Sequence, residues 1–401
     1  MRVLLSTYGS RGDVEPLAGL AVRLRELGAE AVVCAPPDED FARRLAGIGV
    51  PMVPVGPSAR ELTRMVPPPS MSERAAEIIA AQFKSVAAAA EECDVLVATG
   101  MMPAAAGARS VAEKVGIPSF SVTFQQLTLP SPRRRPLAYR GRPFPPEVTD
   151  NRVLWDLDAQ RIDELFGEAL NTNRVANGLA PVDHVRDYVI GDRPWLATDP
   201  VLDPWDGEPE LGVVQTGAWI VPDPAPLPAE LTAFLDAGAP PVHVGFGSMP
   251  MHTSTDVAQV AVEAVRAQGR RLVLARGWAD LASVDDHDDC FIVGEVNQQS
   301  LFGRVAAVVH HGGAGTTTTA TRAGAPQVVV PQTADQPYWA DRIAELGVGV
   351  AHDGPTPTYE SLAAALTVAL APETGARAKA VAGTIRTDGT TVAARLLLDS
   401  V

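Results

Sequence analysis

Basic residues, cysteines and long apolar runs are all scarce in this 401-residue chain, and each scarcity excludes a class of protein. Lysine and arginine number 33 against 48 acidic residues, a net charge of −15, which argues against binding a nucleic-acid backbone. The three cysteines, Cys34, Cys93 and Cys290, are too few and too scattered for a disulfide framework or a zinc site. No apolar run approaches the ~20 residues of a transmembrane helix, and the chain starts directly in a strand pattern without a signal peptide. We therefore expect an acidic cytoplasmic protein that binds no nucleic acid.

Apolar residues, by contrast, make up 46% of the chain, and strand and helix patterns alternate along it. The length suggests two domains. Strand patterns lie at 3–5, 31–33, 94–98 and 119–122 in the first half and at 242–245, 271–274, 291–293, 307–309, 328–330 and 349–351 in the second. Because helix patterns separate these strands, we expect an α/β fold in which each half is a doubly wound parallel sheet with helices on both faces.

A breaker-rich segment separates the two halves. Prolines recur at 200, 204, 209, 222, 224, 226 and 228, which is typical of a stiff, extended linker. We predict a first domain over 1–203, a linker over 204–228 and a second domain over 229–385. Residues 60–82 are the least regular part of the first half and predict a loop followed by an amphipathic helix, which would form a flap.

The most informative segment runs from His310 to Thr317, with the sequence HHGGAGTT, between a strand pattern and a helix pattern. Glycines let the backbone approach a ligand closely, and the free N–H groups at a helix start attract an anion. Thr316 and Thr317 can add hydroxyl donors and His311 an imidazole N–H, whereas alternation along the strand favours a core position for His310. Taken alone the segment is a weak signal, because a tight turn can have the same composition.

Residues 293–336 as a whole resemble the donor-binding signature of nucleotide-sugar glycosyltransferases of family 1, which have the GT-B fold of two Rossmann-like halves. The matching positions are Gln298, His311-Gly312-Gly313, Thr316, Gly324-Ala325-Pro326 and Asp335-Gln336. The stretch from Gly9 to Pro16 resembles the acceptor-side loop of the same family, in the form found in actinobacterial antibiotic glycosyltransferases. The likeness covers nearly the whole chain and is closest to the enzymes that glycosylate vancomycin-type glycopeptide aglycones.

This resemblance implies an inverting, metal-independent transfer of a sugar from a dTDP- or UDP-sugar to a hydroxyl of a glycopeptide aglycone. It implies acceptor binding by 1–203, donor binding by 229–385 and a last helix, 386–401, that packs back on the N-terminal domain. No cofactor is expected because the nucleotide sugar is a substrate, and we expect a monomer. Relatives from plants stack the base on a tryptophan where this chain has Glu295 and bind the ribose with a glutamate where it has Thr319, so those two contacts are not carried over.

The resemblance also implies the donor contacts. For the diphosphate they are Ser10, Ser248, His311, Gly312, Gly313, Gly315 and Thr316. For the nucleoside they are Val296 and Gln298, and for the sugar Asp335 and Gln336, since a carboxylate and an amide side by side suit adjacent hydroxyls. Trp278 is a further nucleoside candidate from its own place in the sequence, as a substitute for the stacking tryptophan that this chain lacks. Each assignment has a structural alternative: a helix cap for Ser10 and Asp335, a plain glycine turn for Ser248 and core packing for Trp278. A cap does not explain the fixed spacing of Asp335 from the glycine turn.

Asp13 is the candidate general base. It follows Gly12 at the end of the first strand-to-helix turn and matches the position of the catalytic histidine in many relatives. The alternative is an acid that caps the first turn of the helix. An aspartate is a weak base toward an alcohol unless its pKa is raised or the acceptor is a phenol, so the role of Asp13 depends on the acceptor.

Several other functions compete with sugar transfer to a glycopeptide. An epimerase of the same fold would need no acceptor site, a nucleotide-sugar sensor would have no use for Asp13, and a related transferase would act on another natural product such as a macrolide. A dinucleotide oxidoreductase is disfavoured because Gly9 to Asp13 lacks the Gly-x-Gly-x-x-Gly spacing. No Asp-x-Asp motif stands where Mg²⁺ would bind a diphosphate, and the acidic pairs at 285–286 and 288–289 are typical of a polar loop.

Overall fold

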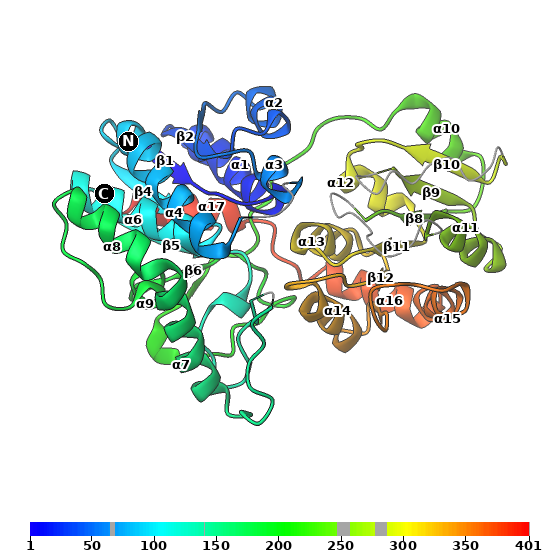
Figure 1. Cartoon of the computed structure of the whole chain (residues 1–401). Coiled ribbons are helices and arrows are strands. Elements are labelled where there is room, and N and C mark those ends of the chain that lie inside the picture. The colour runs from blue at the N-terminus through cyan, green and yellow to red at the C-terminus, as the bar shows by residue number, and fades with distance from the viewer. Residues whose placement is uncertain (65–68, 140, 247–256, 277–286, 401) are drawn as a thin grey trace. The chain divides into compact units, whose positions relative to one another are not determined.

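The chain forms two compact units, each built on a parallel sheet (Figure 1). The computed structural model describes residues 1–64, 69–139, 141–246, 257–276 and 287–400. The first unit comprises Met1–Pro200, Pro204–Val221 and Arg386–Val401, and the second comprises Val201–Asp203 and Pro222–Ile385.

The sheet of the first unit has the strand order β3-β2-β1-β4-β5-β6-β7, and all of its pairs are parallel. Its strands are β1 (Arg2–Ser6), β2 (Glu30–Ala35), β3 (Met52–Pro54), β4 (Val95–Ala98), β5 (Ser119–Thr123), β6 (Trp195–Leu196) and β7 (Val214–Gln215). Its helices are α1 (Arg11–Glu26), α2 (Glu39–Gly47), α3 (Ala59–Arg64), α4 (Met71–Ala81), α5 (Ala87–Ala90), α6 (Met102–Val115), α7 (Asn151–Ile162), α8 (Glu168–Ala176), α9 (Val185–Ile190) and α17 (Gly389–Leu398).

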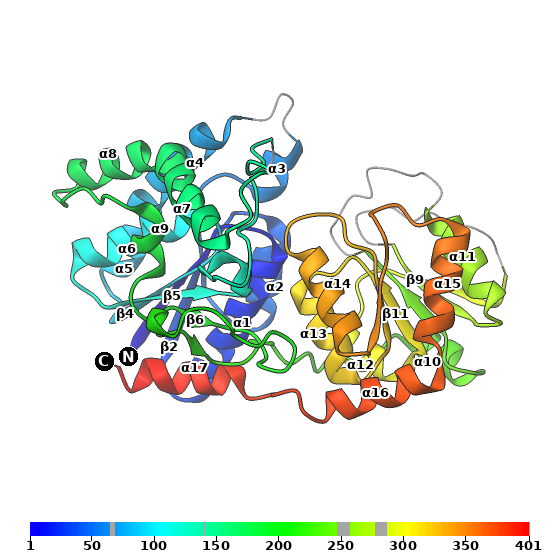
Figure 2. The same ribbon diagram turned by 90° about the horizontal axis from the view of Figure 1, so that it is seen from below.

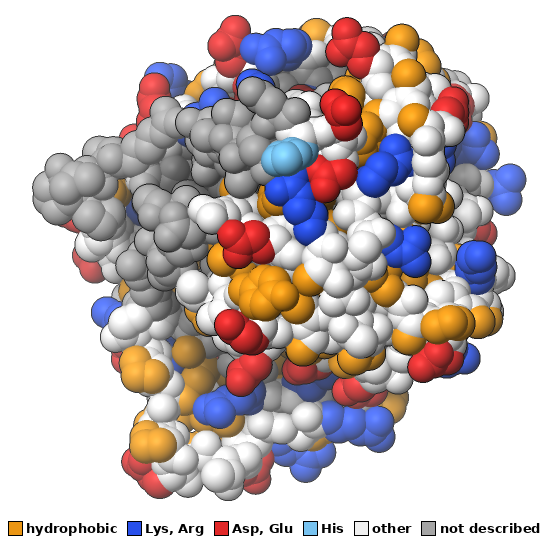
Figure 3. All heavy atoms as spheres, turned by 90° about the vertical axis from the view of Figure 1, so that its right-hand side faces the viewer, with side chains coloured by type: hydrophobic (Ala, Val, Ile, Leu, Met, Phe, Trp, Pro, Cys, Tyr) orange, Lys and Arg blue, Asp and Glu red, His pale blue; other side chains and the backbone are white. Residues whose placement is uncertain are grey.

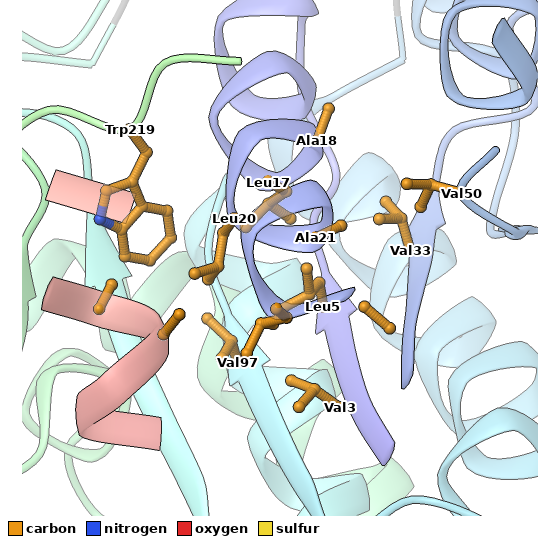
Figure 4. Packing of buried hydrophobic residues seen from close by; sticks show 14 of the residues in the cluster. Val3, Leu5, Leu17, Ala18, Leu20, Ala21, Val33, Val50, Val97 and Trp219 are labelled. Atoms are coloured by element: carbon orange, nitrogen blue, oxygen red, sulfur yellow. The ribbon is translucent and has the colours of Figure 1, made fainter. Parts of the chain in front are cut away.

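Alternation along the strands divides the core of this unit into two layers. Val3 and Leu5 of β1 pack with α1 and α17 on one face, and Leu4 packs with α4, α5 and α6 on the other. Figure 4 shows the first layer, where Leu17 and Leu20 of α1 meet the sheet and Trp219. Trp219 is 3% exposed, and its Nε1–H donates to Thr216 Oγ1 at 2.9 Å. The last helix of the chain thus completes the core of the first unit.

The sheet of the second unit, which Figure 2 shows from below with its helices, has the order β10-β9-β8-β11-β12-β13, again with parallel pairs throughout. Its strands are β8 (Val242–Val244), β9 (Leu272–Ala275), β10 (Cys290–Val293), β11 (Ala307–His310), β12 (Gln327–Val329) and β13 (Gly349–Ala351). Its helices are α10 (Ala229–Asp236), α11 (Val257–Ala267), α12 (Gln298–Leu301), α13 (Ala314–Ala323), α14 (Gln336–Glu345), α15 (Tyr359–Ala369) and α16 (Pro372–Ala382). One core layer packs α11 and α15 on the sheet, and another packs α10, α12 and α13.

The segment predicted as a linker, 204–228, is largely built into the units. Residues 204–221 belong to the first unit, where β7 pairs with β6 and Trp219 joins the core. Residues Pro222–Ile385 belong to the second unit. Pro204 and Pro209 lie between β6 and β7, outside both strands, where they remove no ladder hydrogen bond. The short strands β3, β6 and β7 were not predicted from the sequence.

None of the described helices is long and apolar enough to cross a membrane. On the face of the second unit drawn in Figure 3, acidic and basic side chains are interspersed, and the coloured residues show no broad area of one charge.

Candidate functional site

In both sheets the strand order reverses between two neighbouring strands, β1 and β4 in the first unit and β8 and β11 in the second. The loops that carry Ser10 and His311 follow one strand of each pair, β1 in the first unit and β11 in the second. Ligands of such sheets bind beyond the carboxyl ends of the strands at this switch point. Ser10 and Asp13 come directly after β1, and His311, Gly312 and Gly313 directly after β11. Ser248 and Trp278 lie outside the described residues.

The turn after β11 is forced by glycine. Gly312 has a φ of 93°, and a Cβ there would lie 2.7 Å from Val329 Cγ1 and 3.1 Å from Gln336 O. A side chain at this position is therefore excluded by both conformation and space. The same contact places the turn against the first residue of α14, so the predicted diphosphate and sugar residues of the second unit are neighbours.

Helix α13 begins at Ala314 without a side-chain cap, because its N-cap residue is Gly313. The first N–H groups of a helix have no partner inside the helix, and those of Ala314, Gly315 and Thr316 find no acceptor among the described residues. Thr317 does not point outward as expected, since it is buried and its hydroxyl donates to Gly313 O at 3.0 Å. Thr316 makes no such bond in the described structure, so it is the hydroxyl left for a ligand.

His311 lies over the glycine turn. A Cβ on Gly313 would lie 2.7 Å from His311 Nε2, so glycine lets the ring lie this close to the turn. Its Nδ1 is buried and has no hydrogen-bond partner in the described structure. Burial lowers the pKa of His311 to about 4, so the ring is neutral at physiological pH. It therefore offers an N–H group to an anion and not a positive charge.

His310 is a core histidine, as its strand position predicted. It is fully buried, its Nδ1 accepts from Gly312 N at 3.1 Å, and its Nε2 lies 2.9 Å from Gln327 Oε1. Burial lowers its pKa to about 3, so it stays neutral. His310 thus supports the glycine turn from below and takes no part in ligand binding.

The residues predicted to meet the nucleoside lie at the start of α12. Val296 is partly buried against the α10–α12–α13 core layer, and Gln298 is the first helical residue. Between them, Asn297 was overlooked in the sequence. Its side chain caps α12 by accepting from Ser300 N at 3.0 Å, and its Nδ2 donates to Asp223 O at 2.8 Å and to Ala225 O at 2.7 Å. An asparagine at a helix start was the available signal, and it fixes the 223–225 backbone beside the predicted nucleoside site.

Asp335 and Gln336 are placed differently from each other. Asp335 is the N-cap residue of α14 but makes no cap hydrogen bond, so capping does not account for it. Its Oδ2 accepts from Trp339 Nε1 at 2.7 Å, and burial raises the pKa of its carboxyl group. Gln336 is buried, and its Oε1 accepts from Gln332 N at 2.7 Å and from Thr333 N at 3.2 Å. The amide oxygen of Gln336 thus holds its own loop, which leaves Nε2 as the only group it can offer a sugar.

The loop after β1 is organised by a capping box. Ser10 Oγ accepts from Gly12 N at 3.2 Å, and Asp13 Oδ2 accepts from Ser10 N at 2.7 Å. The Asp13 side chain also lies against Gly9, where a Cβ would come within 2.1 Å of Oδ2. The structure therefore gives Ser10 and Asp13 the capping roles that were their alternatives, and the box also fixes the orientation of the Asp13 carboxylate after β1.

Two further residues tie this loop to the 60–82 segment. Tyr8 is 1% exposed, donates to Pro57 O at 2.9 Å and packs with Leu62 and Ile78. Asp38 accepts from Ser58 Oγ at 2.8 Å and from Ala59 N at 2.8 Å at the start of α3. Neither was singled out from the sequence, because a tyrosine after a strand and an acid before a helix are common. Together they attach the predicted flap to the first strand-to-helix turns.

No group of three or more histidine, cysteine or acidic side chains among the described residues is arranged to hold a metal ion.

Known proteins share this sequence and fold. Residues 3–130 match the glycosyltransferase family 28 N-terminal domain, and residues 272–391 match the C-terminal domain of erythromycin biosynthesis protein CIII-like proteins. The chain is 57% identical to glycosyltransferase GtfE, 56% identical to a vancomycin aglycone glucosyltransferase and 54% identical to a dTDP-epi-vancosaminyltransferase, all from Amycolatopsis orientalis. Each alignment covers 100% of this chain and 98% of the relative.

Solved structures share the fold at lower identity. The glycosyltransferase of kitacinnamycin superposes with a TM-score of 0.75 at 21% identity, covering 99% of this chain and 98% of the other. Glycosyltransferase VinC, solved with dTDP, superposes with a TM-score of 0.72 at 20% identity and covers 99% of each chain.

Proposed function

The chain belongs to the glycosyltransferases, and we propose that it moves a hexose from a dTDP- or UDP-sugar to a hydroxyl group of a glycopeptide aglycone during antibiotic biosynthesis. The substrate class is supported by the full-length relatives, two of which are named for vancomycin aglycone glucosylation and for transfer from dTDP-epi-vancosamine. We assign donor binding to the second unit and acceptor binding to the first. A monomer in the cytoplasm remains our prediction from the sequence.

The observation that carries the donor site is the uncapped start of α13 beside His311. Three backbone N–H groups, the Thr316 hydroxyl and the neutral His311 ring converge on one turn with no partner among the described residues. This is the donor set that a diphosphate requires. Gly312, Gly313 and Gly315 admit the phosphate oxygens to the backbone. The diphosphate contacts of Ser248 and Ser10 remain predictions from the sequence. The nucleoside contact of Trp278 also remains a prediction.

We propose that sugar transfer is a single displacement. Asp13 takes the proton of the acceptor hydroxyl as its oxygen attacks the anomeric carbon, and the bond from that carbon to the diphosphate oxygen breaks on the opposite face. The anomeric configuration is therefore inverted. The negative charge that develops on the leaving diphosphate is stabilised by the N–H donors of α13 and His311. We propose that these donors do the work of a divalent metal, and that Asp335 orients the sugar.

Product analysis tests this function. The enzyme is incubated with glycopeptide aglycones and a panel of dTDP- and UDP-sugars, and the products are identified by mass spectrometry. We expect the aglycone mass to increase by one hexose and the new anomeric centre to be inverted. Absence of a glycosylated aglycone across the panel, with turnover on a macrolide aglycone instead, would assign the alternative acceptor.

Donor alone provides the second test. A transferase with no acceptor hydrolyses its donor only slowly, whereas an epimerase converts it at full rate. Rapid conversion of the sugar nucleotide without any aglycone would therefore replace our proposal by the epimerase. Binding of dTDP or UDP without any turnover would indicate a sensor.

A further inference from the structure

Trp339 stands out among the residues near the proposed sugar site because its ring lies in a hydrophobic cluster while its N–H group donates a hydrogen bond to a carboxylate. It is 1% exposed and belongs to a cluster with Leu202, Val329 and Ile343. Its single polar atom, Nε1, donates to Asp335 Oδ2 at 2.7 Å. A buried indole N–H requires an acceptor. Any buried oxygen would meet this requirement, and here the acceptor is the carboxylate that begins the same helix.

The loop before α14 is built to deliver Asp335 to this contact. Ala334 has a φ of 56°, the only positive value among the described residues other than glycine. Such a conformation costs free energy and persists only where the surroundings impose it. Gln336 Oε1 closes the loop through Gln332 N and Thr333 N. The strained residue lies directly before the carboxylate, as expected when an aspartate must be aimed and not merely placed.

The indole is itself held by chain from outside the main part of the second unit. Val201–Asp203 interrupts the first unit in sequence but belongs to the second unit, where Leu202 packs in one cluster with Trp339 of α14. Arg342 Nε donates to Leu202 O at 2.9 Å, and Tyr338 Oη donates to Asp203 Oδ1. Trp339 therefore cannot rotate away from Asp335 without disturbing this cluster.

We propose that Trp339 is a positioning residue of the donor-sugar site, whose indole N–H fixes one oxygen of Asp335 so that the other faces the sugar hydroxyls. The bond also favours the ionised carboxylate, which burial alone disfavours. An ionised carboxylate accepts hydrogen bonds from two hydroxyls, whereas a protonated one must donate to one of them. This inference rests on the sugar-binding role of Asp335 in the proposed function.

The test compares sugar-nucleotide binding with nucleotide binding in Trp339→Phe, which keeps a buried ring and loses the N–H. We expect the affinity for UDP and dTDP to stay within twofold and the KM for UDP-glucose or dTDP-glucose to rise about tenfold or more, the scale of a lost hydrogen bond to a charged group. The loss should deepen as the pH falls, because without the indole N–H the pKa of the Asp335 carboxyl group rises further and the group protonates at a higher pH than in the wild type. Asp341→Asn, which alters an exposed side chain on the same helix, should change neither the nucleotide affinity nor the KM for the sugar nucleotide.

Asp335→Asn distinguishes the sugar-binding role of Asp335 from the positioning role of Trp339. If this variant leaves the ratio of sugar-nucleotide to nucleotide affinity unchanged, Asp335 does not bind the sugar and the proposed site is wrong. If it changes the ratio while Trp339→Phe does not, only the positioning role of Trp339 is overturned. Should Trp339→Phe fail to bind nucleotide at all, Trp339→Leu repeats the test, and the same pH dependence is required of it.

Discussion

Helices α1 and α13 each follow a strand at the switch point of their sheet, α1 after β1 and α13 after β11, which lies beside β8, and they begin in opposite ways. Ser10 and Asp13 close the start of α1 with a capping box, whereas α13 starts at Gly313 with no side-chain cap. A cap consumes the N–H groups that an anion would bind. The first unit therefore offers a ligand a carboxylate side chain at its switch point, whereas the second unit offers backbone N–H groups. That division suits an enzyme in which one unit supplies a base and the other binds a diphosphate.

The largest effect should come from the side chain of the first unit. Asp13→Asn keeps the size of the residue and can still accept from Ser10 N, so the helix cap survives. Loss of a general base should lower kcat by about 10²- to 10⁴-fold, with nucleotide affinity unchanged because α13 is untouched. The measurement is kcat beside a nucleotide titration. Glu15→Gln, which removes an acid two residues further along α1, is the matched control.

Two outcomes would break this side of the comparison. Wild-type turnover of Asp13→Asn would reduce Asp13 to a helix cap. Loss of nucleotide binding would make it a structural residue. A phenolic acceptor should soften the effect, since its own pKa is near 10 and it needs less help from a base, so aliphatic and phenolic acceptors are assayed separately.

The second effect concerns the backbone site. His311→Ala should cost on the order of 2–4 kcal/mol of transition-state stabilisation, seen as a fall in kcat/KM for the donor. His311→Gln, which restores an N–H donor, should recover part of it. Because the pKa of His311 is lowered to about 4, the wild-type enzyme should show no loss from this group as the pH rises from 6 to 8. A loss in that range that disappears in His311→Gln, or full inhibition by EDTA, would contradict the neutral, metal-free site.

The third effect separates the stability of the two units by pH. Burial lowers the pKa of His243 and His311 to about 4 and that of His310 to about 3, all in the second unit. Below pH 6.5 the unfolded chain takes up protons that these folded residues refuse, so the second unit should lose on the order of 1–2 kcal/mol per histidine between pH 7 and 5. The raised pKa of Asp335 opposes this loss in part.

Asp158 of the first unit acts in the other direction. Burial raises its pKa to about 6 despite the nearby Arg186 and Arg161, so the folded unit holds a proton that the unfolded carboxylate releases. Its contribution to stability therefore rises, by about 1 kcal/mol, as the pH falls from 7 to 5. Hydrogen exchange of the strands, corrected for intrinsic rates, measures both units in one sample. Asp158→Asn should abolish the response of the first unit only; parallel responses of the two units would refute this contrast.

The sequence predicted the parts of the molecule that repeat and missed those that do not. The predicted pair of doubly wound sheets and the predicted glycosyltransferase family are confirmed. Both were predictable because ten strand patterns and the spacing from Gln298 to Gln336 are clear in the sequence. β7 was hidden among prolines in the predicted linker, since pairing with β6 is a tertiary effect. The roles of Gln336 and Asn297 depend on which loop amide each side chain reaches, and no pattern in the sequence records that. The site assignments themselves stay predictions.

The smallest effect decides what Ser10 does. Its hydroxyl accepts from Gly12 N at the start of α1, so Ser10→Ala should destabilise the first unit by about 1 kcal/mol through loss of the cap. We expect only a small fall in kcat, because loss of the cap leaves the Asp13 carboxylate less well ordered. Ser10→Asn keeps a capping oxygen and removes the hydroxyl, and should therefore restore both stability and kcat. The melting temperature and the donor KM are measured together. If Ser10→Asn is as stable as the wild type but its donor KM stays high, the hydroxyl contacts the diphosphate, and the first unit shares in the anion site that the comparison of α1 with α13 gives to the second alone.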